Sequence, residues 1–539
     1  MTTVASATTP GISGVQNSPK NALATAMVVL TILMGLALGA KFLVAQDIWV
    51  DETTQLSGLT LNPLQMLPWL CGQDAQRFGV PGDRMPPLSY WAGWGWSHVF
   101  GLTETSLRVM GLAATVAASW ILFLAARRVW GPWAGVLACA AFLLNPNTLL
   151  ISVEIRAYPL FLLTTVGTLY FLIRVLEPAE SGLWGVWLGL SVCLIAGIYT
   201  HFYGVLVAAA VFCALAAAVI GERKLLRPLL TSAVIVGVAS AGVIPFVLAA
   251  MRMGGGTTAE DFGGGSFAKF IYRSFIGHPA LAVSKPVMLV GMVGFGLMLV
   301  AALLPKPRGR RISRALIVMI CAGCLAAVAA KAVVGKFDAF APSYNLWRVP
   351  VLCLIAASVV TLSWRSLRWM GIAAVACILL AGAWACLTAV NHAAVFRHTP
   401  HREVAKLVRE VGSRTVFYDG ASGWGGAYFP LLFSQAHQLR HLLIQQGATG
   451  EKSISELPSL TPVLDNASLP EQIIVLAAEY QSSGDTTAMC RGLAPHVAIS
   501  EHAKAVLESL GFERVREGVL NAQDAVAFAV YGRRKEPAH

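Results

Sequence analysis

Charged residues are scarce in this chain: of its 539 residues, only 13% are Asp, Glu, Lys or Arg. A soluble globular protein has about 25%, so the composition excludes a soluble multidomain enzyme. The 56% of hydrophobic residues excludes a disordered protein, and ten cysteines are too few for a disulfide scaffold. Because the long apolar runs stop well before the C-terminus, the sequence predicts an α-helical polytopic membrane protein with a soluble C-terminal part.

Eleven apolar segments have the roughly 20 residues that a helix needs to cross a bilayer. The first of them is too long for a signal-peptide core and lacks a convincing cleavage site, so we expect it to be an anchor. The predicted spans are 23–45, 106–126, 133–151, 159–176, 184–200, 203–220, 229–250, 286–304, 315–335, 346–363 and 370–390.

The positive charges between the spans predict their orientation. The net charge of the chain is +12. With a cytoplasmic N-terminus, every second connection is rich in Lys and Arg, as the positive-inside rule requires. The basic excess is thereby explained without a nucleic acid partner. The basic residues of these connections are Arg127, Arg128, Arg174, Arg223, Lys224, Arg227, Lys306, Arg308, Arg310, Arg311, Arg314, Arg365 and Arg368.

The long connection 46–105 then faces the outside. Within it, the Trp-rich segment 87–101 is short, and counting it as a span would reverse every later loop. Since Trp prefers the membrane boundary, we expect an interfacial helix there. Cys71 of this connection and Cys490 of the tail would share one oxidising side, and the sequence leaves open whether they pair.

Residues 392–539 differ from the rest of the chain. Short strand-like apolar runs alternate with helical patterns, which predicts a small α/β domain. The odd number of spans places this domain outside. The expected organisation is therefore a disordered cytoplasmic N-terminus at 1–22, a transmembrane catalytic domain at 23–391 and an extracytoplasmic domain at 392–539, in the inner (plasma) membrane.

Charged and polar residues gather at the predicted external ends of the spans, where ionisable groups tend to mark function. A carboxylate there could accept a proton from an attacking hydroxyl, and an arginine could hold a phosphate through two hydrogen bonds. The sequence therefore predicts an acid–base site for an anionic, lipid-linked substrate. The residues concerned are Asp51, Glu52, Glu154, Arg156, Tyr158, His201, Tyr344 and Arg348.

Each of these residues alone also has a simpler explanation. Asp51 and Glu52 would then be solvated loop residues. Arg156 would be a boundary residue whose charge reaches the interface, and His201 would cap the end of a helix. The order of the motifs, and their occurrence together, favour a functional site over these simpler explanations.

Four motifs follow one another over residues 40–205. They are Trp49-Val50-Asp51-Glu52; Pro86-Pro87-Leu88-Ser89-Tyr90 with Phe100-Gly101, Glu104 and Leu107-Arg108; Asn145-Pro146 leading to Glu154-Ile155-Arg156-Ala157-Tyr158; and Thr200-His201-Phe202-Tyr203. In their order and spacing the chain resembles the membrane-embedded GT-C glycosyltransferases. The most similar members are the protein O-mannosyltransferases and the bacterial lipid A aminoarabinose transferases.

The resemblance implies an inverting transfer of a sugar from a polyprenyl-phosphate donor to a hydroxyl acceptor at the external membrane face. The acceptor class, whether lipid, glycan or protein, stays open. Asp51 would be the general base, Glu52 its neighbour in the site and Glu154 a second acid. The residues expected to bind the donor or its phosphate are Arg84, Arg156, Tyr158, His201, Lys269, Arg273, Tyr344 and Arg348.

The sequence departs from the family pattern in two places. Met85 stands where family members commonly have His before the Pro-Pro pair, and Arg84 could supply the missing positive charge. A later family motif, Arg-Tyr-apolar-Pro, is loosely matched by residues 345–350, where this chain has Arg348-Val349 in place of Arg-Tyr. Both departures concern donor and acceptor specificity and leave the reaction class unchanged.

A P-loop and a dinucleotide-binding glycine fingerprint are missing, which agrees with a lipid-linked donor. The glycine-rich stretch 254–265 is expected to be an external loop, either a linker or a cover over the donor, with Lys269 and Arg273 as phosphate candidates. No cofactor is firmly implied. A divalent metal at Asp51 and Glu52 stays open, although no second set of ligands accompanies them.

Two other functions stay open. A transporter or lipid-linked-sugar flippase would have polar residues near the bilayer midplane and inverted repeats. A non-catalytic assembly partner would tolerate amides at Asp51 and Glu154. The crowding of charge at one face, together with the lack of a convincing repeat, favours the transferase.

Overall fold

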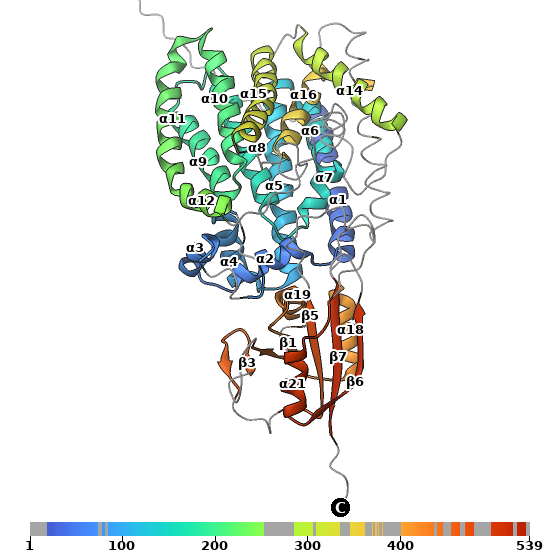
Figure 1. Cartoon of the computed structure of the whole chain (residues 1–539). Helices are drawn as coiled ribbons and strands as arrows, with labels where there is room; N and C mark the ends of the chain where they lie inside the picture. Colours follow the sequence, from blue (N-terminus) through green and yellow to red (C-terminus); the bar gives the residue numbers. More distant parts are fainter. Residues whose placement is uncertain are drawn as a thin grey trace, which may run out of the picture.

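The computed structural model consists of a helical bundle with a small α/β domain at one end (Figure 1). Short helices of the connection between α1 (Pro19–Ala45) and α5 (Glu104–Trp130) lie between the two parts. The residues that the structure describes are 19–73, 78–80, 83, 85–252, 285–304, 309–334, 345–361, 369, 372–373, 376, 380, 400–435, 439–445, 454–463, 469–478, 497–520 and 525–534.

The bundle is a multi-pass membrane domain. Among the described residues, five helical segments are long and apolar enough to cross a membrane, or six if one bent pair counts as a span. The predicted count of eleven is not confirmed, because α9, α10 and α16 are shorter and 370–390 lies largely outside the described residues. The helices are α1 (Pro19–Ala45), α5 (Glu104–Trp130), α6 (Pro132–Leu143), α7 (Pro146–Ser152), α8 (Tyr158–Leu176), α9 (Trp184–Thr200), α10 (Gly204–Val219), α11 (Leu226–Ser240), α12 (Ile244–Arg252), α14 (Lys285–Leu303), α15 (Arg310–Val334) and α16 (Arg348–Ser358).

The predicted span at 133–151 is bent in the structure, because α6 and α7 meet at an angle of 63°. The break falls at Asn145-Pro146. Proline has no N–H for the helix ladder and pushes the preceding residue out of the helical region, and Asn145 is accordingly extended, with ψ 123°. The Asn145 side chain then accepts from the N–H of Asn147 at 2.9 Å, so α7 starts as a new, capped helix.

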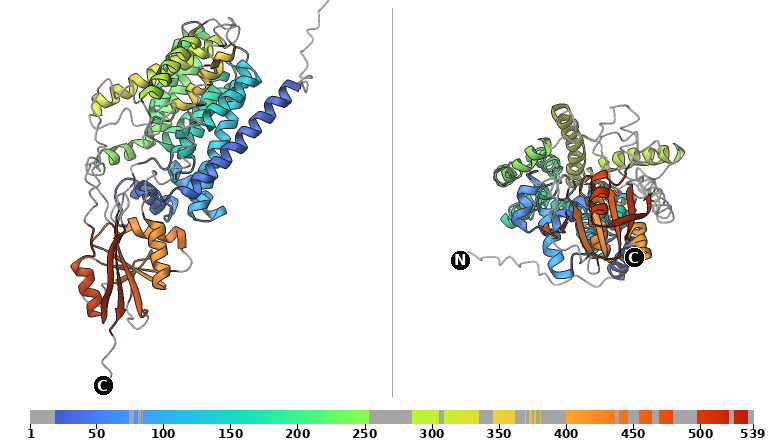
Figure 2. Two further views of the ribbon diagram at one scale, coloured as in Figure 1. Left: turned by 90° about the vertical axis from the view of Figure 1, so that its right-hand side faces the viewer. Right: turned by 60° about the horizontal axis from the view of Figure 1, so that its bottom comes forward.

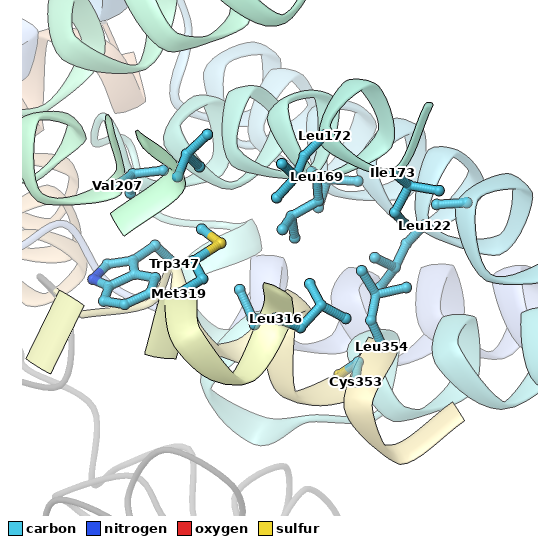
Figure 3. Close-up of a cluster of buried hydrophobic side chains, with 14 of the residues drawn as sticks. Leu122, Leu169, Leu172, Ile173, Val207, Leu316, Met319, Trp347, Cys353 and Leu354 are labelled. Carbon is cyan, nitrogen blue, oxygen red and sulfur yellow. The ribbon is translucent and has the colours of Figure 1, made fainter. Parts of the chain in front are cut away.

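The core of the bundle lies where α5, α8, α10, α15 and α16 meet (Figure 3). Small residues let these helices approach closely, as is usual in membranes. A Cβ on Gly323 of α15 would lie 2.2 Å from the Trp347 ring, and one on Gly135 of α6 would lie 2.6 Å from Phe123. Helix α1 runs obliquely along one side of this core (Figure 2).

Three short helices follow α1: α2 (Val50–Leu59), α3 (Pro63–Leu70) and α4 (Leu88–Phe100), of which α4 corresponds to the helix predicted at 87–101. The 13 residues of α4 correspond to roughly 20 Å at 1.5 Å per residue, which is short of the ~30 Å hydrocarbon core. The three helices lie at the end of the bundle that faces the α/β domain (Figure 1).

The C-terminal domain is a mixed seven-stranded sheet in the order β4-β3-β2-β1-β5-β7-β6. Strand β1 is parallel to β2 and to β5, and the outer pairs are antiparallel. The helices are α18 (His401–Val411), α19 (Gly425–Gln435) and α21 (Glu501–Ser509), and the strands are β1 (Thr415–Asp419), β2 (Arg440–Ile444), β3 (Ile454–Glu456), β4 (Thr461–Pro462), β5 (Gln472–Ala478), β6 (Phe512–Leu520) and β7 (Val526–Arg533). The predicted α/β domain is confirmed. Cys490 lies outside the described residues, while Cys71 is a free thiol.

One apolar cluster joins the first external connection to the α/β domain. It contains Trp69 of α3 and Tyr90 of α4 together with Trp424 and Tyr428 of the domain. One close approach is at Gly79, where an added Cβ would lie 2.5 Å from the Trp424 indole. Since Gly79 also has φ +63°, only glycine fits this contact.

His441 makes the α/β domain sensitive to acid. It is 5% exposed, its Nδ1 lies 2.8 Å from the Tyr418 hydroxyl, and burial lowers its pKa to about 4. In the unfolded chain the pKa is about 6.5, so the unfolded state gains a proton first as the pH falls. Stability is therefore present above pH 6.5 and decreases by up to about 3 kcal/mol as the pH falls to 4.

We expect the thermal transition of this domain to shift down between pH 6.5 and 4 and to shift less in His441→Gln. His502→Gln, which changes a partly exposed histidine of the same domain, is the matched control. Equal pH dependence in wild type and His441→Gln would contradict the assignment.

Candidate active site

Helix α2 begins at the motif that the sequence singles out. The Trp49 N–H donates to Glu52 Oε2 at 3.3 Å, so the Glu52 side chain caps the first turn of the helix. Asp51 and Glu52 both lie in this turn, where the partial positive charge of the helix favours carboxylates. Because adjacent helical residues point about 100° apart, Glu52 turns into the protein while Asp51 stays partly exposed.

Glu52 is held by a closed ion pair. Its two oxygens accept from the two terminal nitrogens of Arg108, each at 3.0 Å, and Oε1 also accepts from the Ile155 N–H at 2.8 Å. Neither side chain of the pair is exposed. Burial raises the pKa of the Glu52 carboxyl, while Arg108 and the Ile155 N–H act in the opposite direction. Glu52 thus ties α2 to α5 and to the connection between α7 and α8.

Arg108 extends this network. Its Nε donates to Glu104 at 3.0 Å, one turn earlier on α5, and its Nη1 donates to the Val153 carbonyl at 2.6 Å. The sequence motif contains both Glu104 and Arg108, and their i, i+4 spacing is the signal of a pair on one helix face. The contact with Glu52, 56 positions away, depends on tertiary packing alone.

Arg156 lies beside Asp51. Its Nη1 donates to the Asp51 carbonyl at 2.9 Å and to Asp83 Oδ2 at 2.8 Å. Burial alone would lower the pKa of Arg156, but the charges of Asp83 and then Asp51 raise it well above its usual value. The site therefore contains a buried, permanently charged guanidinium next to a partly exposed carboxylate.

Asp83 was missed by the sequence analysis. It accepts a hydrogen bond from the Tyr90 hydroxyl and fixes Arg156 from the other side. Burial, with the charge of Asp83 as the second cause, raises the pKa of Tyr90 well above its usual range. The only signal in the sequence is an acid shortly before the Pro86-Pro87 pair.

His201 is a neutral, aromatic part of the site. It follows the end of α9, and its ring stacks on Phe161 at 5.1 Å and lies 5.7 Å from the Tyr158 ring. Its Nδ1 accepts from the Tyr203 N–H at 3.2 Å. Burial, together with the Arg156 charge, lowers the pKa of His201 to about 3, so the imidazole carries no charge at neutral pH.

Arg348 reaches the same cluster from the far end of the chain. It is 3% exposed, it begins α16, and its Nε donates to the Asn345 carbonyl at 3.1 Å. Its guanidinium interacts electrostatically with Tyr203, whose ring lies 5.4 Å from His201. Glu154 is half-buried, two positions before Arg156.

The structure thus brings five of the predicted residues together: Asp51, Glu52, Arg156, Tyr158 and His201. Arg348 is connected to this group through Tyr203, which lies beside His201. The remaining donor-binding candidates, Arg84, Lys269, Arg273 and Tyr344, lie outside the described residues. Within the described part of the chain, no group of three or more His, Cys, Asp or Glu could hold a metal ion.

Comparisons with known proteins show what the chain is similar to. The family model "Dolichyl-phosphate-mannose-protein mannosyltransferase" matches residues 84–248, a region that includes Arg108, Arg156 and His201. The chain is similar to the crystal structure of ArnT from Cupriavidus metallidurans in the apo state. The identity is 15%, the match covers 94% of this chain and 98% of that one, and the TM-score is 0.50. The protein has a GT-C fold.

ArnT bound to undecaprenyl phosphate gives a similar match to this GT-C chain, with 14% identity, the same coverage and a TM-score of 0.51. The archaeal oligosaccharyltransferase AglB from Archaeoglobus fulgidus, in complex with an inhibitory peptide and a dolichol-phosphate, is similar at 12% identity. That match covers 85% of this chain and 69% of AglB, with a TM-score of 0.47. No curated protein sequence matches the chain. The predicted resemblance to GT-C glycosyltransferases is confirmed.

Proposed function

We propose that this protein is an inverting glycosyltransferase that moves a sugar from a polyprenyl-phosphate donor to a hydroxyl acceptor at the external membrane face. The observation that carries the proposal is the position of Asp51 beside the buried Arg156, whose Nη1 donates to the Asp51 backbone carbonyl at one end of the bundle. A base for a hydroxyl and a cation for a phosphate are the two groups that this reaction needs. The similarity to ArnT, which has been crystallised with undecaprenyl phosphate, supports this donor class.

The reaction is a single displacement. Asp51 takes the proton of the acceptor hydroxyl while the hydroxyl oxygen forms a bond to the anomeric carbon of the sugar. The bond between that carbon and the phosphate oxygen breaks, and polyprenyl phosphate leaves with the electron pair. Arg156 and Arg348 stabilise the charge that develops on the phosphate, because a guanidinium binds phosphate oxygens through two hydrogen bonds.

Glu52 has a different role in this proposal. Its oxygens are engaged by Arg108 and the Ile155 N–H, so it positions the residues on either side of it: Asp51 on α2 and Arg156 beside Ile155. Glu154, half-buried and near Arg156, stays a candidate for the second acid. Tyr158 and the neutral His201 would form the aromatic wall behind the phosphate site.

The proposed orientation places the site and the α/β domain in the periplasm. Arg108 lies near the start of α5, and Arg128 lies near its end. A helix of 27 residues is roughly 40 Å long, so the two arginines are at opposite membrane faces. Arg128 lies at the end of the bundle that holds the predicted cytoplasmic connections, where it forms ion pairs with Glu177 and Glu180 at 2.7 Å.

A reporter fusion tests the orientation. Alkaline phosphatase joined after residue 400 should be active and green fluorescent protein joined there should be dark, because the first folds outside and the second inside. The matched fusion after Gly221, in a predicted cytoplasmic connection, should give the reverse. Activity of the fluorescent protein at residue 400 would contradict the orientation.

The function itself is tested with the purified protein and a panel of polyprenyl-phosphate sugars. We expect release of polyprenyl phosphate from at least one donor, with the sugar appearing on an added acceptor or in water. Transport of the intact lipid-linked sugar between the leaflets of a vesicle, without cleavage, would favour the flippase.

A further inference from the structure

His401 is the point where the α/β domain meets the network behind the candidate base. It is the first residue of α18 and is only 3% exposed. Its Nε2 lies 3.7 Å from Glu104 Oε2, and its Nδ1 lies 3.7 Å from Asp47 Oδ1. The ring is therefore wedged between the first turn of α5 and the connection that leads from α1 to α2.

From His401 a series of polar contacts reaches Glu52, the residue after Asp51. Glu104 accepts from Arg108 at 3.0 Å, and Arg108 holds both oxygens of Glu52. Glu52 is the next residue after Asp51 and also binds the Ile155 N–H, next to Arg156. The series runs through buried side chains, since Arg108 and Glu52 are fully buried and Glu104 is 18% exposed.

The neighbouring residue of α18 secures the same connection. Arg402 pairs with Asp47 at 2.7 Å, and its Nη2 donates to the carbonyls of Val44 at 2.7 Å and Gln46 at 3.2 Å. The start of α18 thus holds both the end of α1 and the start of α5. A short shift of this helix end would change the position of the α2 motif.

We propose that His401 is a positioning residue for the transfer reaction, through which the α/β domain fixes the Asp51 turn by way of Glu104, Arg108 and Glu52. This inference rests on the proposed function, because the proposed function is what makes Asp51 of that turn the base. The α/β domain then contributes to the reaction by holding the residues of the membrane domain in position. His401 itself touches no reacting atom.

The first test is kinetic and uses the full-length protein in detergent or nanodiscs. His401→Ala should lower kcat about tenfold, as expected when a buried polar contact of this kind is lost, while the KM for the donor stays within about twofold. His401→Gln keeps a donor that can reach Glu104 and should recover most of kcat. The control Lys406→Ala changes an exposed residue on the same helix and should match wild type.

A double-variant cycle tests the route. If His401 acts through Glu104, His401→Ala should have little further effect in a Glu104→Gln background. Additive losses would mean that His401 acts elsewhere, and the proposed route would be wrong. Equal kcat in wild type and His401→Ala would overturn the proposal.

The second test does not depend on transferase activity. Hydrogen–deuterium exchange should be faster in the α2 peptides of His401→Ala than in those of wild type and Lys406→Ala, because α2 loses the support that reaches it from His401 through Glu104 and Arg108. Unchanged exchange in α2 would overturn the positioning role even if activity fell. If exchange in α2 is faster in His401→Ala but the wild-type protein shows no transferase activity, the positioning role of His401 is supported and the proposed function is refuted.

Discussion

Asp51→Asn should reduce sugar transfer by about 10³-fold, within the 10² to 10⁴ range of general base catalysis. Asparagine has nearly the same shape as aspartate but cannot take the proton of the acceptor hydroxyl. The Arg156 bond goes to the Asp51 carbonyl and not to its carboxylate, so this contact survives the substitution. The loss should therefore appear in kcat, with little change in the KM for the donor.

Two controls make this result specific. The melting temperature of Asp51→Asn should equal that of wild type, because the partly exposed side chain is not part of the core. Asp51→Glu keeps a carboxylate but displaces it, and it should recover a fraction of the activity. Wild-type turnover in Asp51→Asn at matched expression would remove Asp51 as the base and favour a non-catalytic function.

Of the single substitutions that we propose in the membrane domain, Arg108→Met should be the most destabilising. It leaves Glu52 buried without its main partner, and removing one member of a buried ion pair costs about 3–5 kcal/mol. Activity should fall with stability, because both Asp51 and Arg156 adjoin the network that Arg108 holds. The measurement is the free energy of unfolding in detergent, together with donor turnover.

The chain provides a matched control on the same helix. Arg128 is also paired with two carboxylates, but its side chain is 36% exposed. Arg128→Met should therefore cost less than about 1 kcal/mol. The double variant Glu52→Gln/Arg108→Met should be more stable than Arg108→Met alone, because glutamine at position 52 leaves no buried carboxylate without its partner there. Equal losses for Arg108→Met and Arg128→Met would contradict the buried pair.

The class of fold and the region of the site could be predicted from local sequence. Apolar length, the distribution of basic residues and the strand-like runs of the tail are properties of short segments, and the structure keeps them. Asp51 and Arg156 could be singled out because the motifs that contain them follow one another in a recognisable order and spacing. The bend at Asn145-Pro146 was visible in the sequence, but the hydropathy of 133–151 outweighed it.

The partners within the site could not be predicted, because they come from segments far apart in the chain. Asp83 is an ordinary loop residue until it meets Arg156, 73 positions later. Glu52 was expected to act on the substrate, yet its side chain is used to join three elements. His201 was expected to bind phosphate as a polar residue, and only its burial among aromatic rings reveals that it is uncharged.

The apolar cluster around Gly79 and Trp424 has a consequence for biosynthesis. The two residues are 345 positions apart in the printed sequence, so at about 5–20 residues per second the ribosome needs roughly 20–70 s to make the second after the first. During that interval the aromatic face of α3 and α4 lacks its cover. The nascent loop therefore exposes these aromatic side chains to its surroundings until the last part of the chain is made.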